Sequence, residues 1–201
     1  MKKQIAIFGG CFNPPLNSHF SLAEQILNEH QNIEKILFVP VSNKYDKKGL
    51  IDDKHRYNML KLICDKNPKF DISRIEMDNE RQLFTIETLI ELQKEYPEIE
   101  LVFITGSDNL KELEKWQKAE ELVEKFKLMI LERADDNMEN IINSSQFLMK
   151  NADSFIKANL KLRSNLSSTF VRESVKLGKS IKYLIPVEIE EYILQNKLYL
   201  E

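Results

Sequence analysis

The chain has 201 residues, 42% of them hydrophobic and 30% charged, so its length and composition predict one globular domain over residues 1–201 and exclude a disordered or fibrous protein. The formal net charge of -3, with both signs interspersed, argues against a nucleic-acid-binding protein and makes any phosphate binding local. The two cysteines and three histidines lack the spacing of a zinc site, and the absence of a run of about 18 apolar residues predicts a cytoplasmic protein without a membrane span.

Short apolar runs alternate with amphipathic stretches, which is typical of a parallel β-sheet with crossover helices. The continuous apolar character of the runs indicates strands that are buried on both faces. We therefore predict an α/β fold with a doubly wound parallel sheet. The expected strands, in chain order, are residues 5–8, 36–39, 70–72, 101–104, 128–131 and 156–162.

The last third of the chain is less regular than the rest. Residues 134–153 are polar and predict one helix flanked by loops. A further helix follows residues 166–169 and is expected to end near Gly178, because glycine is favoured just beyond a helix C-terminus. With a final helix at about residues 187–196, the sequence predicts a small C-terminal helical part.

Glycines mark one edge of the predicted sheet. Gly9, Gly10 and Gly106 directly follow strands, at the carboxyl edge where open α/β sheets bind ligands. Glycine lets the backbone approach a phosphate closely, and the next helix offers unpaired N–H groups. Neither G-x-G-x-x-G nor a Gly-Lys-Ser/Thr loop follows, which disfavours a dehydrogenase or a P-loop ATPase. The pattern predicts a nucleotide site after the first strand.

Two segments carry a family resemblance. Residues 9–19, Gly-Gly-Cys-Phe-Asn-Pro-Pro-Leu-Asn-Ser-His, resemble the opening motif of the Rossmann-like nucleotidyltransferase superfamily, and residues 166–172, Leu-Ser-Ser-Thr-Phe-Val-Arg, resemble its second signature. Residues 84–89, residues 103–108, Trp116 and residues 131–133 are similar to nicotinate or nicotinamide mononucleotide adenylyltransferases. The resemblance covers nearly the whole chain. It implies adenylyl transfer from ATP to a pyridine mononucleotide, with Mg²⁺, giving the dinucleotide and pyrophosphate in NAD biosynthesis.

The resemblance also implies an ATP site. In an in-line transfer no protein nucleophile is needed, and donors aimed at phosphate supply the catalysis. We therefore predict that His19 and Arg172 are catalytic; the alternatives are a solvent-facing helix histidine and a solvated arginine. The serines and threonine beside Arg172 have an ordinary helix N-cap as their alternative. The predicted ATP-binding residues are Gly9, Gly10, Phe12, Asn13, His19, Lys44, Ser167, Ser168, Thr169 and Arg172.

Lysines follow the second predicted strand, and a solvated polar loop is the alternative for all of them. Of Lys44, Lys47 and Lys48, the sequence favours Lys44 as the one that approaches the phosphates.

The resemblance implies a separate pyridine nucleotide site. By resemblance, Trp116 stacks on the pyridine ring, and its alternative is packing in the core. By resemblance, Asp108 accepts hydrogen bonds from a ribose or helps to place magnesium, and its alternative is helix N-capping. No other side chain is predicted to bind a metal. The predicted residues are Thr85, Gly106, Asp108 and Trp116.

The sequence departs from the family pattern at several positions. Leu16 stands where the family has the first histidine of its motif or a threonine, Ser18 replaces a glycine, and Phe84 replaces a common tyrosine. Leucine cannot hydrogen-bond a phosphate, so a working enzyme and a nucleotide-binding protein that has lost turnover both stay open, as does an adenylyltransferase for another phosphate acceptor. If the site is otherwise intact, Leu16→His is expected to raise turnover. The choice between nicotinate and nicotinamide nucleotides and the presence of a homo-oligomer also stay open.

Overall fold

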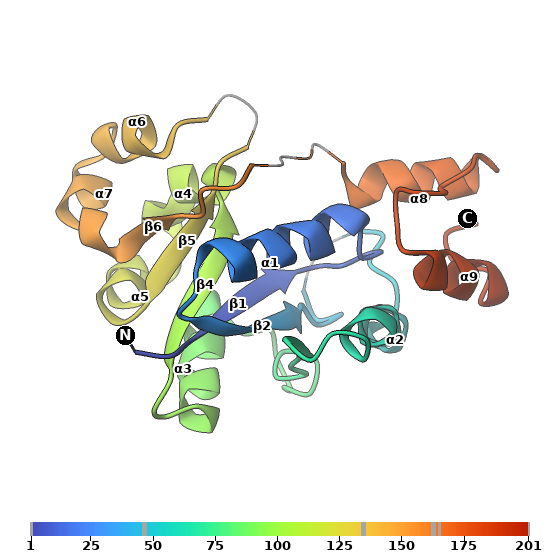
Figure 1. The fold of residues 1–201 in the computed structure, drawn as a ribbon, viewed down its shortest axis with the longest axis horizontal. Helices are drawn as coiled ribbons and strands as arrows, with labels where there is room; N and C mark the ends of the chain where they lie inside the picture. Colours follow the sequence, from blue (N-terminus) through green and yellow to red (C-terminus); the bar gives the residue numbers. More distant parts are fainter. Residues whose placement is uncertain (1, 46–47, 134–135, 162–163, 165, 201) are drawn as a thin grey trace.

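The computed structural model describes residues 2–45, 48–133, 136–161, 164 and 166–200. Its centre is a six-stranded sheet in the order β3-β2-β1-β4-β5-β6, and every neighbouring pair runs parallel (Figure 1). The strand order reverses between β1 and β4, which confirms the predicted doubly wound, Rossmann-like sheet. The strands are β1 Gln4–Gly10, β2 Ile33–Pro40, β3 Phe70–Ile72, β4 Glu100–Gly106, β5 Lys127–Leu131 and β6 Phe155–Lys157.

Helices cover both faces of the sheet, so alternate strand residues enter two different cores. Ala6 and Phe8 of β1 pack with α1 and α2, whereas Ile5 and Ile7 pack with α3 and α5. The double burial explains why the strands are continuous apolar runs. The helices are α1 Asn17–Glu29, α2 Asp53–Cys64, α3 Thr85–Glu95, α4 Ser107–Glu112, α5 Ala119–Lys125, α6 Met138–Asn143, α7 Gln146–Lys150, α8 Ser168–Lys176 and α9 Val187–Gln195, with short 3-10 helices η1 Leu113–Lys115 and η2 Ala152–Ser154.

The polar region after β5 differs from its prediction. It holds the two short helices α6 and α7 instead of one, because Asn137 and Ser145 each accept a backbone N–H as an N-cap and so begin a new helix. Residues 134–135 lie outside the described part of the chain, as does residue 162 of the predicted last strand. The described strand β6 ends at Lys157, earlier than expected.

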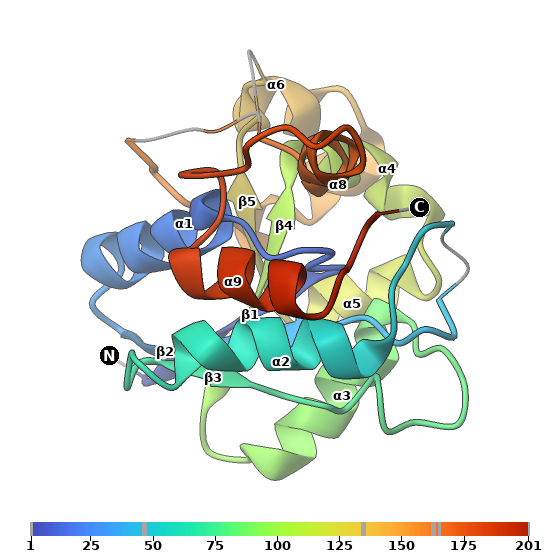
Figure 2. The ribbon, with the colours of Figure 1, turned by 90° about the vertical axis from the view of Figure 1, so that its right-hand side faces the viewer.

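The C-terminal helices return to the carboxyl edge of the sheet. Gly178 follows α8 with a φ of +64°, the left-handed conformation that glycine adopts at helix ends. Helix α9 lies beside α2 (Figure 2), where the Tyr192 hydroxyl is 2.9 Å from His55 Nδ1 and accepts a bond from Asn58 Nδ2. This docking carries the chain end back to the loop after β1. No described helix combines the length and apolar character needed to cross a bilayer.

Candidate active site

The loop between β1 and α1 is held by hydrogen bonds to its carbonyl groups. Phe12 has a φ of 45°, and its ring lies so close to Gly10 that a Cβ there would come within 3.1 Å of it. The donors come from three separate segments of the chain, so the loop has its shape before any ligand arrives. The bonds are Val41 N–H to Gly10 O at 3.0 Å, Arg56 Nη1 to Cys11 O at 3.0 Å, Arg172 Nη1 to Asn13 O at 2.9 Å and Ser168 Oγ to Pro14 O at 2.8 Å.

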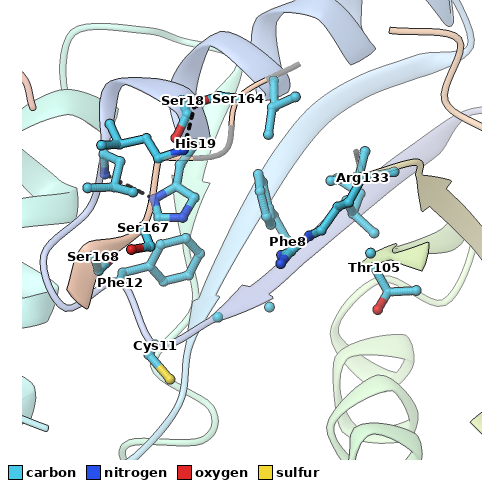
Figure 3. A pocket seen from close by; sticks show the side chains of 18 of the residues that line it. Phe8, Cys11, Phe12, Ser18, His19, Thr105, Arg133, Ser164, Ser167 and Ser168 are labelled. Atoms are coloured by element: carbon cyan, nitrogen blue, oxygen red, sulfur yellow. Dashed lines mark hydrogen bonds between the residues drawn. The ribbon is translucent and has the colours of Figure 1, made fainter. Parts of the chain in front are cut away.

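His19 lies in the first turn of α1, half-buried at the wall of a cavity. Its Nδ1 accepts the backbone N–H of Leu16 at 3.0 Å, so the neutral ring carries its hydrogen on Nε2. Burial, together with the positive charge of Arg133, lowers the pKa of His19 to about 4. The ring therefore stays neutral near pH 7. Figure 3 shows it beside Phe12, with Arg133 on the opposite side of the cavity.

The cavity has a volume of about 510 Å³ and opens at the carboxyl edge of β1, β4 and β5. Both sequence signatures contribute to its wall, although about 150 residues separate them in the chain. Figure 3 shows Ser167 and Ser168 on the same side as His19 and Phe12. The predicted site residues that line the cavity are Gly9, Gly10, Phe12, Asn13, His19, Gly106, Ser167, Ser168, Thr169 and Arg172.

The start of α8 joins both signatures. The Ser167 hydroxyl accepts the Phe170 N–H at 3.2 Å, so this serine is the N-cap of α8. This is the role that the sequence offered as the alternative to phosphate binding. Arg172 is bonded rather than solvated, since its second Nη donates to Thr169 Oγ1 at 3.2 Å while the first holds Asn13 O. A helix N-terminus and a guanidinium group thus face the same cavity, and both favour an anion.

Both polar atoms of the Asn13 side chain make hydrogen bonds within the protein. Its amide nitrogen donates to Gly49 O at 2.7 Å, and its oxygen accepts the Tyr199 hydroxyl at 2.9 Å. Burial raises the pKa of Tyr199, which keeps the hydroxyl protonated as a donor. Asn13 therefore shapes the cavity by joining three segments instead of presenting a free amide to a ligand.

Four predicted residues are not part of the described cavity wall. Lys44 Nζ donates to the carbonyl of Asn79, and Lys48 lines the cavity in its place. Lys47 lies outside the described residues. The remaining three of the four residues belong to the predicted pyridine nucleotide site: Thr85, Asp108 and Trp116.

These three residues lie on elements close to β4. Thr85 begins α3, and the half-buried Trp116 ring meets Phe103, which does line the cavity, with 6.4 Å between ring centroids. Asp108 is in the first turn of α4 but is not its N-cap, since that position belongs to Gly106.

Arg133 and Arg56 were missed as site residues. Arg133 lines the cavity, with its Nε 3.4 Å from the Asp108 carboxylate, and a Cβ on Gly106 would come within 3.0 Å of that Nε. Its segment shares the family resemblance, which is a signal that pointed to it. Arg56 gave none, because an arginine on an amphipathic helix usually lies in solvent; here its side chain is fully buried behind the first loop.

Leu16 is a core residue at the start of α1. Its side chain is 1% exposed and packs in the apolar cluster on the α1 face of the sheet, while its backbone N–H serves His19. Leu16 therefore packs in the core at a position where the family motif has a polar residue. The His19 ring is still held in place by the Leu16 backbone N–H.

Comparison with known proteins places the chain in a family. A Cytidylyltransferase-like family model matches residues 7–174. A protein of Clostridium tetani named probable nicotinate-nucleotide adenylyltransferase is 37% identical over 202 residues, covering 99% of this chain and 100% of its own length. The nicotinate-nucleotide adenylyltransferase of Bacillus subtilis is 32% identical, covering 98% of each chain. The chain belongs to the nicotinate-nucleotide adenylyltransferase family.

Membership makes the protein a nucleotidyltransferase, and a solved structure supports its fold. The nicotinic acid mononucleotide adenylyltransferase of Plasmodium falciparum, solved with NaAD, superposes with a TM-score of 0.82 at 24% identity, covering 99% of this chain and 100% of that one. Adenylyl transfer in NAD biosynthesis, expected from the two signatures, is therefore confirmed at the level of the family.

Proposed function

We propose that the enzyme transfers the adenylyl group of ATP to nicotinate mononucleotide, producing the nicotinate dinucleotide and pyrophosphate. The observation that carries the proposal is the convergence of the loop after β1 and the N-terminus of α8 on one cavity. The relatives' names supply the acceptor, since they specify the nicotinate nucleotide.

The reaction is an in-line displacement. An oxygen of the acceptor phosphate forms a bond to the α-phosphorus of ATP, the bond from that phosphorus to the α,β-bridging oxygen breaks, and pyrophosphate leaves. Negative charge builds on the non-bridging α-oxygens, and the Nε2–H of His19 donates to one of them. The N-terminus of α8 and Arg172 hold the β- and γ-phosphates, with Lys48 as a further cation.

Magnesium reaches the site on ATP rather than in a protein cage. Among the described residues, no three His, Cys, Asp or Glu side chains gather as metal ligands, and Mg²⁺ commonly keeps waters and phosphate oxygens as ligands. When bound, the ion neutralises the charge of the triphosphate. Asp108, exposed and beside Arg133, is the residue we propose to meet its hydration shell or a ribose hydroxyl.

The acceptor is proposed to lie on the β4 side of the cavity. Gly106 and the nearby Phe103 belong to its wall, and Trp116 packs edge-on against Phe103. We propose that the pyridine ring stacks on Trp116. Thr85, at the start of α3, offers a helix N-terminus to the nicotinate carboxylate. A cytoplasmic location and one domain over residues 1–201 remain predictions, and the presence of a homo-oligomer stays open.

The test is a comparison of acceptors. The purified protein is incubated with ATP, Mg²⁺ and nicotinate mononucleotide, nicotinamide mononucleotide or pantetheine phosphate, and the adenylylated product and pyrophosphate are quantified. We expect equimolar dinucleotide and pyrophosphate, formed fastest with the nicotinate nucleotide. ATP binding without product from any acceptor would support the loss of turnover instead, and product from pantetheine phosphate alone would assign another acceptor.

A further inference from the structure

Arg56 is the most deeply buried charged side chain near the cavity. It is 0% exposed and is not part of the cavity wall, so it does not touch a nucleotide there. Burial lowers the pKa of its guanidinium group, against the opposing charge of the Asp53 carboxylate. A buried charge is costly unless its donors are used, and the position of those donors shows what the residue does.

The guanidinium group joins the two loops that border the cavity. Nη1 donates to Cys11 O at 3.0 Å in the loop after β1, and Nε donates to Ile51 O at 3.1 Å at the end of the loop after β2. Nη2 donates to Asn43 Oδ1 at 3.2 Å and pairs with the Asp53 carboxylate. The loop after β2 carries Lys48 into the cavity wall. Arg56 is the side chain that joins this loop to the first loop at Ile51 and Asn43, and the bond from Asn13 Nδ2 to Gly49 O is a second link beside Lys48.

The bond to Cys11 also orients the neighbouring amide. Across a trans peptide the C=O and the following N–H point in opposite directions. With the Cys11 carbonyl turned toward buried Arg56, the N–H of Phe12 points to the cavity side, and within the described part of the chain it makes no backbone hydrogen bond. A backbone N–H aimed at a phosphate site is a strong, uncharged donor.

We infer that Arg56 is a positioning residue for the triphosphate: it holds the Phe12 N–H and the Lys48 loop in the geometry that binds ATP, without contacting ATP itself. The inference rests on the proposed ATP site but not on the proposed acceptor. Asp53 and Asn43 support it by holding the guanidinium group, since the Asn43 N–H also donates to Asp53 Oδ1 at 2.8 Å.

The test measures ATP binding without acceptor, by calorimetry, in Arg56→Lys and Asn43→Ala. Lysine keeps the charge but lacks the planar set of donors. We expect Arg56→Lys to raise the dissociation constant roughly 10- to 100-fold, the effect of losing one hydrogen bond to a charged phosphate. Asn43 is exposed, so Asn43→Ala should fold and should raise the constant by a smaller factor in the same direction.

Leu60→Ala is the matched control, because Leu60 is a buried residue of the same helix that makes no bond to either loop. It should lower the melting temperature and leave ATP affinity unchanged. In turnover assays Arg56→Lys should raise the KM for ATP more than the KM for nicotinate mononucleotide.

Unchanged ATP affinity in a folded Arg56→Lys protein would overturn the inference. If Arg56→Lys does not fold, unchanged affinity in Asn43→Ala would overturn it. Inactivity of the wild type toward every acceptor would count against the proposed function alone, because the binding measurement does not depend on transfer.

Discussion

The two sides of the cavity are built differently. On the proposed phosphate side, residues 9–19 and 167–172, the backbone carbonyls of the first loop are held by Val41, Arg56, Ser168 and Arg172. The proposed acceptor side consists of residues from separate elements, Thr85, Gly106, Asp108 and Trp116, and of these only Gly106 reaches the described cavity wall. A preformed backbone site suits the phosphate groups, which ATP brings with every acceptor. Side chains at the rim suit the acceptor's ring, which differs from one acceptor to another.

The largest expected effect is on the phosphate side. His19→Ala removes the Nε2–H donor and should lower kcat by about 100- to 1,000-fold, the usual cost of losing one donor to a developing negative charge. His19→Asn, which keeps an N–H donor on a shorter side chain, should retain part of the rate. Steady-state kinetics with saturating ATP and nicotinate mononucleotide decide the point: a His19→Ala enzyme with wild-type kcat would remove His19 from the mechanism.

Leu16→His tests whether the phosphate side has adapted to an apolar residue. The sequence alone suggested that this change would raise turnover, but the 1% exposed leucine packs in the core, so an imidazole there would bury polar nitrogens without partners. We expect a loss of about 1–3 kcal/mol in unfolding free energy and no gain in kcat. Leu16→Met, which conserves volume, should cost less than about 1.5 kcal/mol. Denaturant unfolding measures both; a stable, faster Leu16→His enzyme would contradict this account.

On the proposed acceptor side, substitutions of Trp116 distinguish stacking on the pyridine ring from packing against Phe103. If it stacks on the pyridine ring, Trp116→Ala loses about 0.5–1.5 kcal/mol of aromatic interaction, which raises the KM for nicotinate mononucleotide several-fold and leaves the KM for ATP unchanged. Trp116→Phe should retain most of the affinity. A lower melting temperature with unchanged KM values would mean that Trp116 only supports Phe103.

The smallest effect concerns the chain end. Tyr199→Phe removes the hydroxyl that donates to Asn13 Oδ1 at 2.9 Å, and should cost about 1 kcal/mol of stability and lower the melting temperature by about 2–4 °C. Tyr183→Phe is the matched control, since Tyr183 is 83% exposed and should show no change. Equal melting temperatures of both variants and the wild type would show that the bond to Asn13 contributes nothing.

Much of the fold follows from local patterns, and so does the phosphate side. Continuous apolar runs predict buried parallel strands because both faces are covered, and Gly10 ends β1 where the Phe12 ring needs the space. Lys44 and Lys48 cannot be distinguished from the sequence, since only the course of the loop decides which ammonium group reaches the cavity. Arg56 gives no local signal either, because its partners lie in loops that only the folded chain brings together.

The most direct test of the account is a crystal structure of the protein with Mg²⁺ and an ATP analogue that cannot transfer its adenylyl group. We predict a triphosphate between the loop after β1 and the N-terminus of α8, with an α-phosphate oxygen within hydrogen-bond distance of His19 Nε2 and another phosphate oxygen on the Phe12 N–H. A triphosphate bound elsewhere, or one whose phosphates contact neither His19 nor the start of α8, would contradict the proposed site.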